Sequence, residues 1–399
     1  MTVKEASPFN KIRGVRLAAV ASGLKKDSLD LALIELDENC VCSAVFTQSS
    51  FAAAPILISR EHLKDESSRY ILVNSGNANA ATGNEGFENA IRCCESVAEM
   101  AGLKKEAVLP FSTGVIGEPL NYQKIQSAIP SLFEKLAADG WVDVARAIVT
   151  TDTTIKISSH EIEIGDKAVK ITGVAKGSGM IQPNMATMLS FLATDALIDR
   201  KVLDKIISEV CQKTFNRITV DGDTSTNDAC VLISTGLSGV DCNKSPKLDL
   251  VQEGVFQVMR DLAMAIVKDG EGATKFVEVR VKGGKTKLDS RNIAYSIANS
   301  PLVKTALFAS DPNWGRLVMA VGKADASIDA SKIDIHLNNL LLMKTGQIEK
   351  NYTEEKGFVE MKKSSIIITI NLNLGQHEEI VWTTDLSYDY VKINSEYRT

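Results

Sequence analysis

Apolar residues occur along the chain in two patterns, one typical of strands and one typical of helices. Runs of β-branched and other apolar residues, each bounded by polar or turn-forming residues, predict strands. These runs are residues 29–36, 70–74, 188–192, 230–234, 276–281 and 365–374. Apolar residues at helical spacing predict helices over residues 87–101, 203–215 and about 255–267. Because strict strand–helix–strand alternation is missing, the pattern favours an α+β layered sandwich over a doubly wound parallel sheet.

The chain has 399 residues, a length typical of two to three domains. A polar stretch at residues 282–291, KGGKTKLDSR, predicts a boundary between a main domain, 1–281, and a smaller domain, 282–384. Its GGKT resembles the end of a phosphate-binding P-loop, but Val279 replaces the required earlier glycine, so a hairpin turn is expected. The end of the chain, DYVKINSEYRT at 389–399, has a strand-like start, and we expect the tail 385–399 to dock rather than fray.

The amino-acid composition of the chain argues against several classes of function. The chain is 44% hydrophobic and 24% charged, with a net charge of −5 and scattered lysines, which argues against a nucleic-acid footprint and favours a small-molecule partner. Seven cysteines without a CxxC pair make a disulfide framework or zinc site unexpected. The sequence shows neither a signal-peptide pattern nor an apolar run of membrane-spanning length, so a cytoplasmic protein is expected.

Two metal or catalytic patterns fail. Acidic and polar residues alternate over 221–227 as in a calcium-binding loop, but Thr226 stands where glycine is needed and Leu232 where glutamate is needed. The four histidines are isolated from one another, so spacing suggests neither a metal cluster nor a Ser-His-Asp triad. No metal site is expected.

The most informative run is 173–192, GVAKGSGMIQPNMATMLSFL. Its glycines and Pro183 predict a shaped loop, after which Thr187 would open a buried strand. A hydroxyl at such a junction can be held rigidly. Taken alone, the pattern is more often a structural turn before a core strand, with Lys176 a solvated lysine.

Five other runs are polar and glycine-bearing: VNSGNANAATG at 73–83, FSTGVIGE at 111–118, TTDT at 150–153, DGEGATK at 269–275 and SDPNWGR at 310–316. Each by itself is typical of a turn or helix cap, because glycine, asparagine, serine and aspartate favour such places for backbone reasons. Five in one chain are harder to explain in this way.

With these motifs the chain resembles, over essentially its whole length, the ornithine acetyltransferases, the glutamate N-acetyltransferase family of arginine biosynthesis. The resemblance is carried by STGVIGE, TTDT, KGSGMIQPNMATML at 176–189, DGEGATK, SDPNWGR and the terminal KINSEYRT. It implies a layered α/β fold that resembles N-terminal-nucleophile enzymes with its own topology, a smaller second α/β domain, and a heterotetramer of two alpha and two beta chains.

The resemblance also implies self-cleavage between Ala186 and Thr187 into chains 1–186 and 187–399. The Thr187 hydroxyl would attack the Ala186 carbonyl, and an N-to-O acyl shift followed by hydrolysis would free the threonine α-amine. That amine has an ordinary pKa of about 7.7 to 8.0 and can take the hydroxyl proton without a histidine. Thr187 would then carry acetyl from N2-acetyl-L-ornithine to L-glutamate with ping-pong kinetics. No cofactor is implied; acetyl-CoA as a further donor stays open.

The family's site residues fall on matching positions here. By resemblance, Thr113 and Gly114 form the oxyanion hole, through a hydroxyl and a backbone N–H respectively. The implied substrate-binding residues are Thr153, Lys176, Thr187, Glu271, Asn394 and Thr399, and the tail 385–399 would dock at the active site. From charge, Lys176 attracts the substrate carboxylate and Glu271 pairs with an amine, although these two roles can be exchanged.

Two other functions are compatible with the same motifs. The first is a self-processed amidohydrolase or aminopeptidase that uses the N-terminal threonine and passes the acyl group to water. The second is a non-enzymatic amino-acid-binding protein that never cleaves. Release of free acetate distinguishes the first from an acetyltransferase, and ligand binding by an intact chain distinguishes the second.

Overall fold

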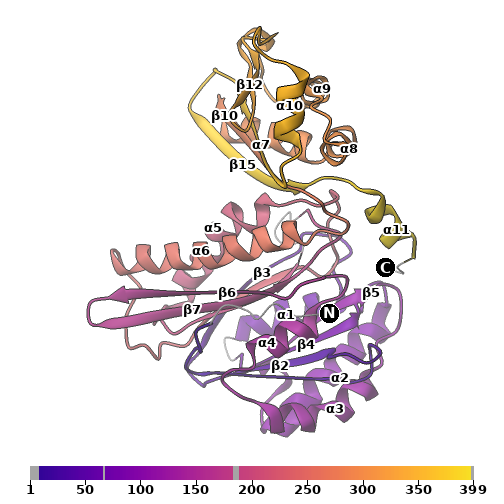
Figure 1. Cartoon of the computed structure of the whole chain (residues 1–399). Coiled ribbons are helices and arrows are strands. Elements are labelled where there is room, and N and C mark those ends of the chain that lie inside the picture. The colour runs from indigo at the N-terminus through magenta and orange to yellow at the C-terminus, as the bar shows by residue number, and fades with distance from the viewer. Residues whose placement is uncertain (1–8, 66–67, 183–187, 397–399) are drawn as a thin grey trace. The chain divides into compact units, whose positions relative to one another are not determined.

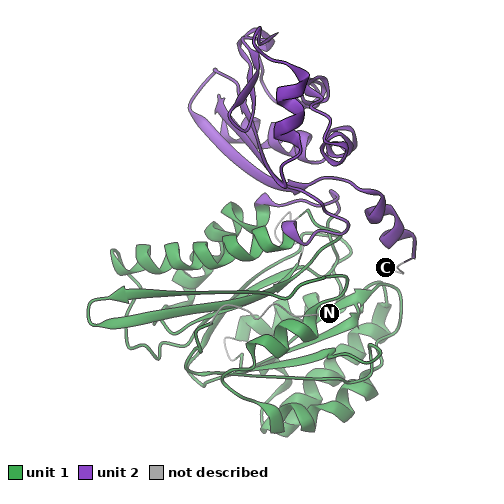
Figure 2. Cartoon of the chain, viewed as in Figure 1, with its two compact units in different colours: residues 1–216, 224–266, 398–399 green, residues 217–223, 267–397 purple. Residues whose placement is uncertain are grey.

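The computed structural model describes residues 9–65, 68–182 and 188–396. They divide into two compact units, each considered by itself (Figure 2). Unit 1 holds the described residues up to 266 except 217–223, and unit 2 holds those seven residues together with 267–396.

Unit 1 contains two sheets (Figure 1). The four-stranded sheet has the order β1 (Val15–Val20), β2 (Leu31–Leu36), β4 (Tyr70–Asn77), β5 (Val108–Val115). The five-stranded sheet has the order β3 (Val41–Phe46), β9 (Ala229–Ser234), β8 (Leu189–Thr194), β7 (Lys167–Lys176), β6 (Lys156–Ile164). Within these sheets β4 is parallel to β5 and β8 to β9, whereas the other neighbours are antiparallel.

Helices line both sheets of unit 1. They are α1 (Ala54–His62), α2 (Gly83–Ala101), α3 (Tyr122–Lys135), α4 (Trp141–Ile148), α5 (Arg200–Lys213) and α6 (Lys247–Lys268), with 3₁₀ turns at Leu63–Asp65, Lys105–Ala107 and Phe215–Arg217. One core joins the inner faces of both sheets with α4, where Phe111 packs edge-on against Phe191 near buried Trp141. A second core lies under α2 and α3 on the other face of the four-stranded sheet. The predicted layered α+β arrangement is therefore confirmed.

Unit 2 is built on one six-stranded sheet. Its order is β13 (Gln347–Ile348), β12 (Leu340–Lys344), β11 (Asp334–Leu337), β14 (Ser365–Asn371), β10 (Phe276–Gly284), β15 (His377–Thr384). The helices are α7 (Lys287–Ala298), α8 (Pro301–Ala309), α9 (Trp314–Gly322), α10 (Glu354–Met361) and α11 (Tyr388–Glu396), with a 3₁₀ turn at Ala330–Lys332. Val279, Ile297 and Ile368 are among the buried residues that form the core of this unit.

All six predicted strands and all three predicted helices are present. Most ends are shifted by a few residues, but α6 begins at Lys247, well before the predicted start at about 255. The predicted boundary after Val281 is wrong, because β10 runs on to Gly284 and pairs with both β14 and β15 inside unit 2. The expected hairpin turn at GGKT is wrong as well: Thr286 and Asp289 form a reciprocal cap that starts α7.

The strand-like start predicted for the C-terminal segment is also wrong, because its described part forms α11. The Ser387 hydroxyl accepts a hydrogen bond of 3.3 Å from the Tyr390 N–H, which satisfies one of the free donors at the start of this helix. Among the described residues, no helix is both long and apolar enough to cross a membrane.

All seven cysteines are buried free thiols. Burial raises their pKa to about 11 for Cys40 and Cys242, to about 12 for Cys42, Cys93 and Cys211, and well above the usual value for Cys94 and Cys230. An unfolded thiol ionises near pH 8.5. The contribution of these thiols to stability is therefore complete below pH 8.5 and lost as pH rises above it.

We expect the free energy of unfolding to fall by several kcal/mol between pH 8.5 and 9.5, at about 1 kcal/mol per thiol, because each unfolded thiol ionises progressively over this interval. Urea denaturation in reducing buffer measures this change. Replacing Cys93 and Cys211 with alanine should lower the overall stability but make its pH dependence shallower. Stability that stays constant over this interval would refute the burial of the thiols.

Candidate active site

Thr113 and Gly114 lie at the end of β5, where the parallel pairing with β4 is interrupted by a bulge at Asn77. Gly114 has a φ of +132°, and a Cβ there would lie 2.4 Å from the carbonyl carbon of Gly76. Only glycine fits this close backbone approach. The motifs VNSGNANAATG and FSTGVIGE are therefore neighbours, joined through the ends of β4 and β5.

Lys176 ends β7 in the other sheet of unit 1. Its ammonium nitrogen donates a hydrogen bond of 3.1 Å to the Oγ1 of Thr113, which is 8% exposed. The structure thus brings together two residues that were singled out 63 positions apart in sequence. A fixed cation beside a hydroxyl and a glycine backbone is a suitable arrangement for stabilising developing negative charge.

Asp152, in the TTDT run, joins three parts of this site. Its Oδ1 accepts hydrogen bonds from the Lys156 ammonium at 2.6 Å and from the Gly177 N–H at 2.7 Å. The Lys156 and Asp152 side chains are completely buried. Burial alone would raise the pKa of Asp152, but Lys156, Lys176 and these hydrogen bonds outweigh it and hold the pKa at about 2. The anion fixes the TTDT loop to the glycine turn after β7, and Thr153 follows it on the surface.

Two polar residues before β9 were missed by the sequence reasoning. The Asn227 amide donates to the carbonyls of Ser112 at 2.9 Å and Ala78 at 2.6 Å, so it joins β5 just before Thr113 to the residue that follows β4. Asp228 is 2% exposed, and its Oδ2 has no hydrogen-bond partner among the residues described. Burial raises its pKa, opposed by a hydrogen bond from Ser225 and by the charge of Lys176. Their only sequence signal was the polar stretch before a buried strand.

Glu271 and Asn394 come together within unit 2. The Asn394 amide donates a hydrogen bond of 2.8 Å to Glu271 Oε2, and Glu271 is 9% exposed. The adjacent Gly272 has a φ of +65°, and a Cβ there would lie 2.5 Å from the Tyr390 nitrogen. Ser387 Oγ also donates to the Gly272 carbonyl at 2.6 Å. The DGEGATK turn is therefore packed against the start of α11, which carries Asn394.

Two buried charged residues, Asp385 and Lys304, lie close to the DGEGATK turn. Asp385 Oδ1 accepts from the backbone N–H groups of Thr274 and Lys275 at 2.9 and 3.0 Å. The buried Lys304 ammonium donates to Thr383 Oγ1 at 3.0 Å. Burial lowers the pKa of Lys304 to about 8, against the attraction of Asp385 and Asp221. Because the folded state loses this proton before the unfolded state does, the contribution of Lys304 to the free energy of unfolding rises with pH above 8. This rise offsets only a small part of the loss from the thiols.

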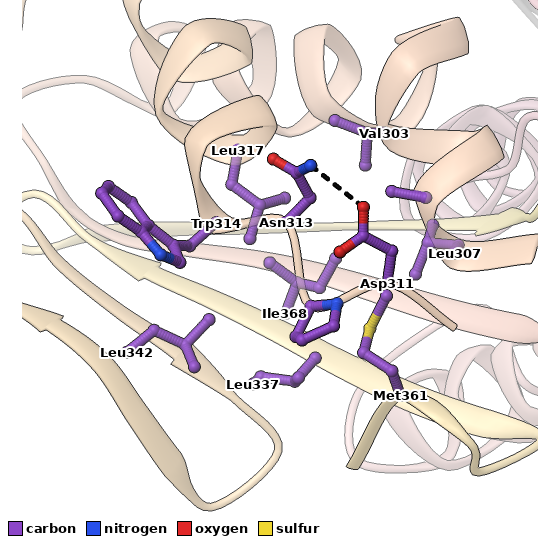
Figure 3. Close-up of a pocket in the computed structure, with 12 residues that line it drawn as sticks. Val303, Leu307, Asp311, Asn313, Trp314, Leu317, Leu337, Leu342, Met361 and Ile368 are labelled. Atoms are coloured by element: carbon purple, nitrogen blue, oxygen red, sulfur yellow. Dashed lines mark hydrogen bonds between the residues drawn. The ribbon is translucent and has the colours of Figure 1, made fainter. Parts of the chain in front are cut away.

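The SDPNWGR run has a structural role in unit 2. The Asn313 side chain caps α9 by accepting from the Arg316 N–H at 3.2 Å, and its amide donates to Asp311 at 3.0 Å (Figure 3). Trp314, Leu317 and Ile368 help to line a mostly apolar cavity of about 20 Å³ beside it. This space is near the volume of one water molecule and is too small for an amino acid.

The predicted site residues thus fall into two groups. Unit 1 carries Thr113, Gly114, Thr153 and Lys176, and unit 2 carries Glu271 and Asn394. Ala186, Thr187 and Thr399 lie outside the described residues. Within the described ranges, no group of three or more His, Cys, Asp or Glu side chains is arranged to hold a metal ion.

Comparisons with known proteins identify the family. A model described as the ArgJ family matches residues 16–399. The arginine biosynthesis bifunctional protein ArgJ of Psychrobacter arcticus is 47% identical over 97% of both chains, and that of Methylococcus capsulatus is 47% identical over 97% of this chain and 96% of its own. A solved structure of the protein of this name from Bacillus halodurans is 38% identical with a TM-score of 0.51, covering 53% of this chain and 100% of its own. The chain therefore belongs to the ArgJ family.

Proposed function

We propose that this chain is a self-processing acetyltransferase that moves acetyl from N2-acetyl-L-ornithine to L-glutamate in arginine biosynthesis. The observation that carries the proposal is the cluster of Lys176, Thr113 and Gly114 in a chain of the ArgJ family. The names of relatives that match over almost the whole chain support a role in arginine biosynthesis. They do not favour the alternative of an amidohydrolase or aminopeptidase.

Cleavage would occur between Ala186 and Thr187, in the run that precedes β8. The solved chain from Bacillus halodurans is matched in full yet covers only 53% of this chain. That share is close to the one residues 187–399 would form, which supports two separate products. The described part of β8 is buried along its whole length, so a new N-terminus just before it would be anchored by the sheet.

Transfer would proceed through an ester on Thr187. The freed α-amine takes the hydroxyl proton as Thr187 attacks the acetyl carbonyl, and it returns a proton to the departing ornithine amine. Thr113 and Gly114 would stabilise the tetrahedral oxyanion in both half-reactions. Glutamate then attacks the ester through its amine. This chemistry requires neither a metal nor a bound cofactor.

The charges of the predicted site residues suggest which group of the substrate each one contacts. Lys176 would attract the α-carboxylate and Glu271 the side-chain amine of acetylornithine, with Thr153, Asn394 and Thr399 as further contacts. The hydrogen bond between Asn394 and Glu271 supports a joint role for these two residues, because it orients the carboxylate. The C-terminal tail, residues 385–399, would complete the site by docking over the bound substrate.

The word bifunctional in the relatives' names supports a second activity, acetylation of glutamate with acetyl-CoA as the donor. A cytoplasmic heterotetramer of two alpha and two beta chains completes the proposal. Initial rates test its central part. With acetylornithine and glutamate varied together, parallel double-reciprocal lines and formation of acetylglutamate are expected. Intersecting lines, or free acetate as the main product, would contradict the proposal.

Replacing Glu271 with glutamine is expected to raise the KM for acetylornithine roughly tenfold while self-cleavage remains complete, because the change removes an ion pair with the substrate amine and leaves the nucleophile intact. Steady-state kinetics and the denatured masses measure both effects. Asp389→Asn, which removes an exposed charge on α11, serves as the control. An unchanged KM would remove Glu271 from the substrate site.

A further inference from the structure

Lys25 lies on the loop between β1 and β2, and this loop is closed around a buried carboxylate. Asp30 is 0% exposed and accepts backbone N–H hydrogen bonds from Ser22 at 2.6 Å, Gly23 at 3.1 Å and Lys25 at 2.8 Å. Three bonds to one carboxylate fix the backbone from which the Lys25 side chain starts. Its position is therefore set by the fold.

The Lys25 side chain runs along the proposed oxyanion site. A Cβ at Gly76 would lie 2.8 Å from Lys25 Cγ, and the backbone of Gly76 is the part of β4 that touches Gly114. The ammonium then donates a hydrogen bond of 3.0 Å to the Val149 carbonyl, at the start of the TTDT loop. The half-buried Lys25 thus lies between Gly76 and the loop that Asp152 anchors.

The charge of Lys25 interacts with those of Lys176 and of two carboxylates. Burial lowers its pKa, Lys176 lowers it further, and Asp30 and Asp152 oppose both effects. Asp152 is already paired with Lys156 at 2.6 Å, and Asp30 is occupied by three backbone N–H groups. Lys25, whose side chain lies against Gly76, and Lys176, which donates to Thr113, thus bring two lysines to the proposed oxyanion site. Two cations held near one point favour the binding of an anionic group there.

We propose that Lys25 is a second cation, acting with Lys176, that binds the α-carboxylate of both amino-acid substrates. This inference rests on the proposed function. In acetylornithine and in glutamate, the α-carboxylate is attached to the carbon that bears the reacting nitrogen. When the acetyl group is held at Thr113 and Gly114, the carboxylate must therefore lie within a few ångströms of them, where Lys25 and Lys176 supply the charge.

The experiment removes the charge from the protein and the carboxylate from the substrate separately. Lys25→Met and Lys25→Arg are compared with the wild type and with Lys26→Met, which changes the exposed neighbour. The donors are N-acetylornithine and N-acetylputrescine, the same molecule without its carboxylate. The readout is the single-turnover rate of acetylation of the processed protein, followed by denatured mass, because this assay also measures slow donors.

We expect Lys25→Met to lower the second-order rate constant with N-acetylornithine by about 10- to 100-fold and to change that with N-acetylputrescine less than twofold. Lys25→Arg should retain most of the rate, and Lys26→Met all of it. An equal loss with both donors would overturn the inference, because Lys25 would then act on the oxyanion or the loop. No loss with either donor would also overturn it. Failure of the proposed function is distinct: the wild-type protein itself would not become acetylated.

Discussion

Replacing Thr187 with alanine is expected to leave a single chain of 43.2 kDa with no measurable acetyl transfer. The variant lacks the hydroxyl that attacks the Ala186 carbonyl, so the α-amine of residue 187 is never released. Removal of a covalent nucleophile typically costs 10⁴-fold or more in rate. Denatured mass and an acetylglutamate assay measure the two losses on one preparation.

Thr187→Ser provides the matched control, because it keeps a hydroxyl at the same position. It should cleave and transfer acetyl, both more slowly than the wild type. If Thr187→Ala still divides into two chains, the cleavage point lies elsewhere. If it stays intact and still makes acetylglutamate at the wild-type rate, the transfer does not use a threonine ester.

Thr113→Val is expected to lower kcat by about 10² to 10³, the usual effect of losing one oxyanion donor. Valine matches the shape of threonine and suits the end of β5, but it can neither donate to the oxyanion nor accept the hydrogen bond from Lys176. The melting temperature should therefore shift by only a few degrees. Turnover by the isolated, processed fraction and thermal unfolding measure these effects.

Thr113→Ser should restore most of the lost activity, because the hydroxyl returns without the methyl group. A Thr113→Val variant that retains full kcat would exclude the hydroxyl from oxyanion stabilisation. The Lys176 contact would then be only structural. A serine variant as impaired as the valine variant would show that the hydroxyl alone is not sufficient and that the methyl group, which valine keeps, is also required.

The hydrophobic pattern predicted the elements well where a strand is buried on both faces. Residues 230–234 are one example. Every position of β9 is buried, so the sequence of the strand itself is an almost continuous apolar run. The pattern failed at KGGKTKLDSR, because a strand end and a helix cap are both polar and glycine-rich and together look like a linker. It failed at the C-terminal tail, where a helix start depends on the side chain of Ser387.

For the site, the resemblance named Thr113 and Lys176, and the structure places them in contact. No local signal pointed to Lys25, and the polar stretch that contains Asn227 gave no indication of its role. Lys25 reaches Val149 across 124 residues, and Asn227 reaches Ser112 across 115. Such contacts follow from the pairing of β4 with β5 and of β8 with β9, which a single sequence does not reveal. Lone lysines and asparagines in polar loops look alike until those strands are paired.

The most direct test of the account is the denatured mass of freshly purified wild-type protein after incubation with N-acetylornithine alone. We predict two chains that join between Ala186 and Thr187, with one acetyl group added to the chain that begins at Thr187 and removed again by glutamate. A single 43.2 kDa chain, or two chains that never carry acetyl while acetylglutamate forms, would contradict it.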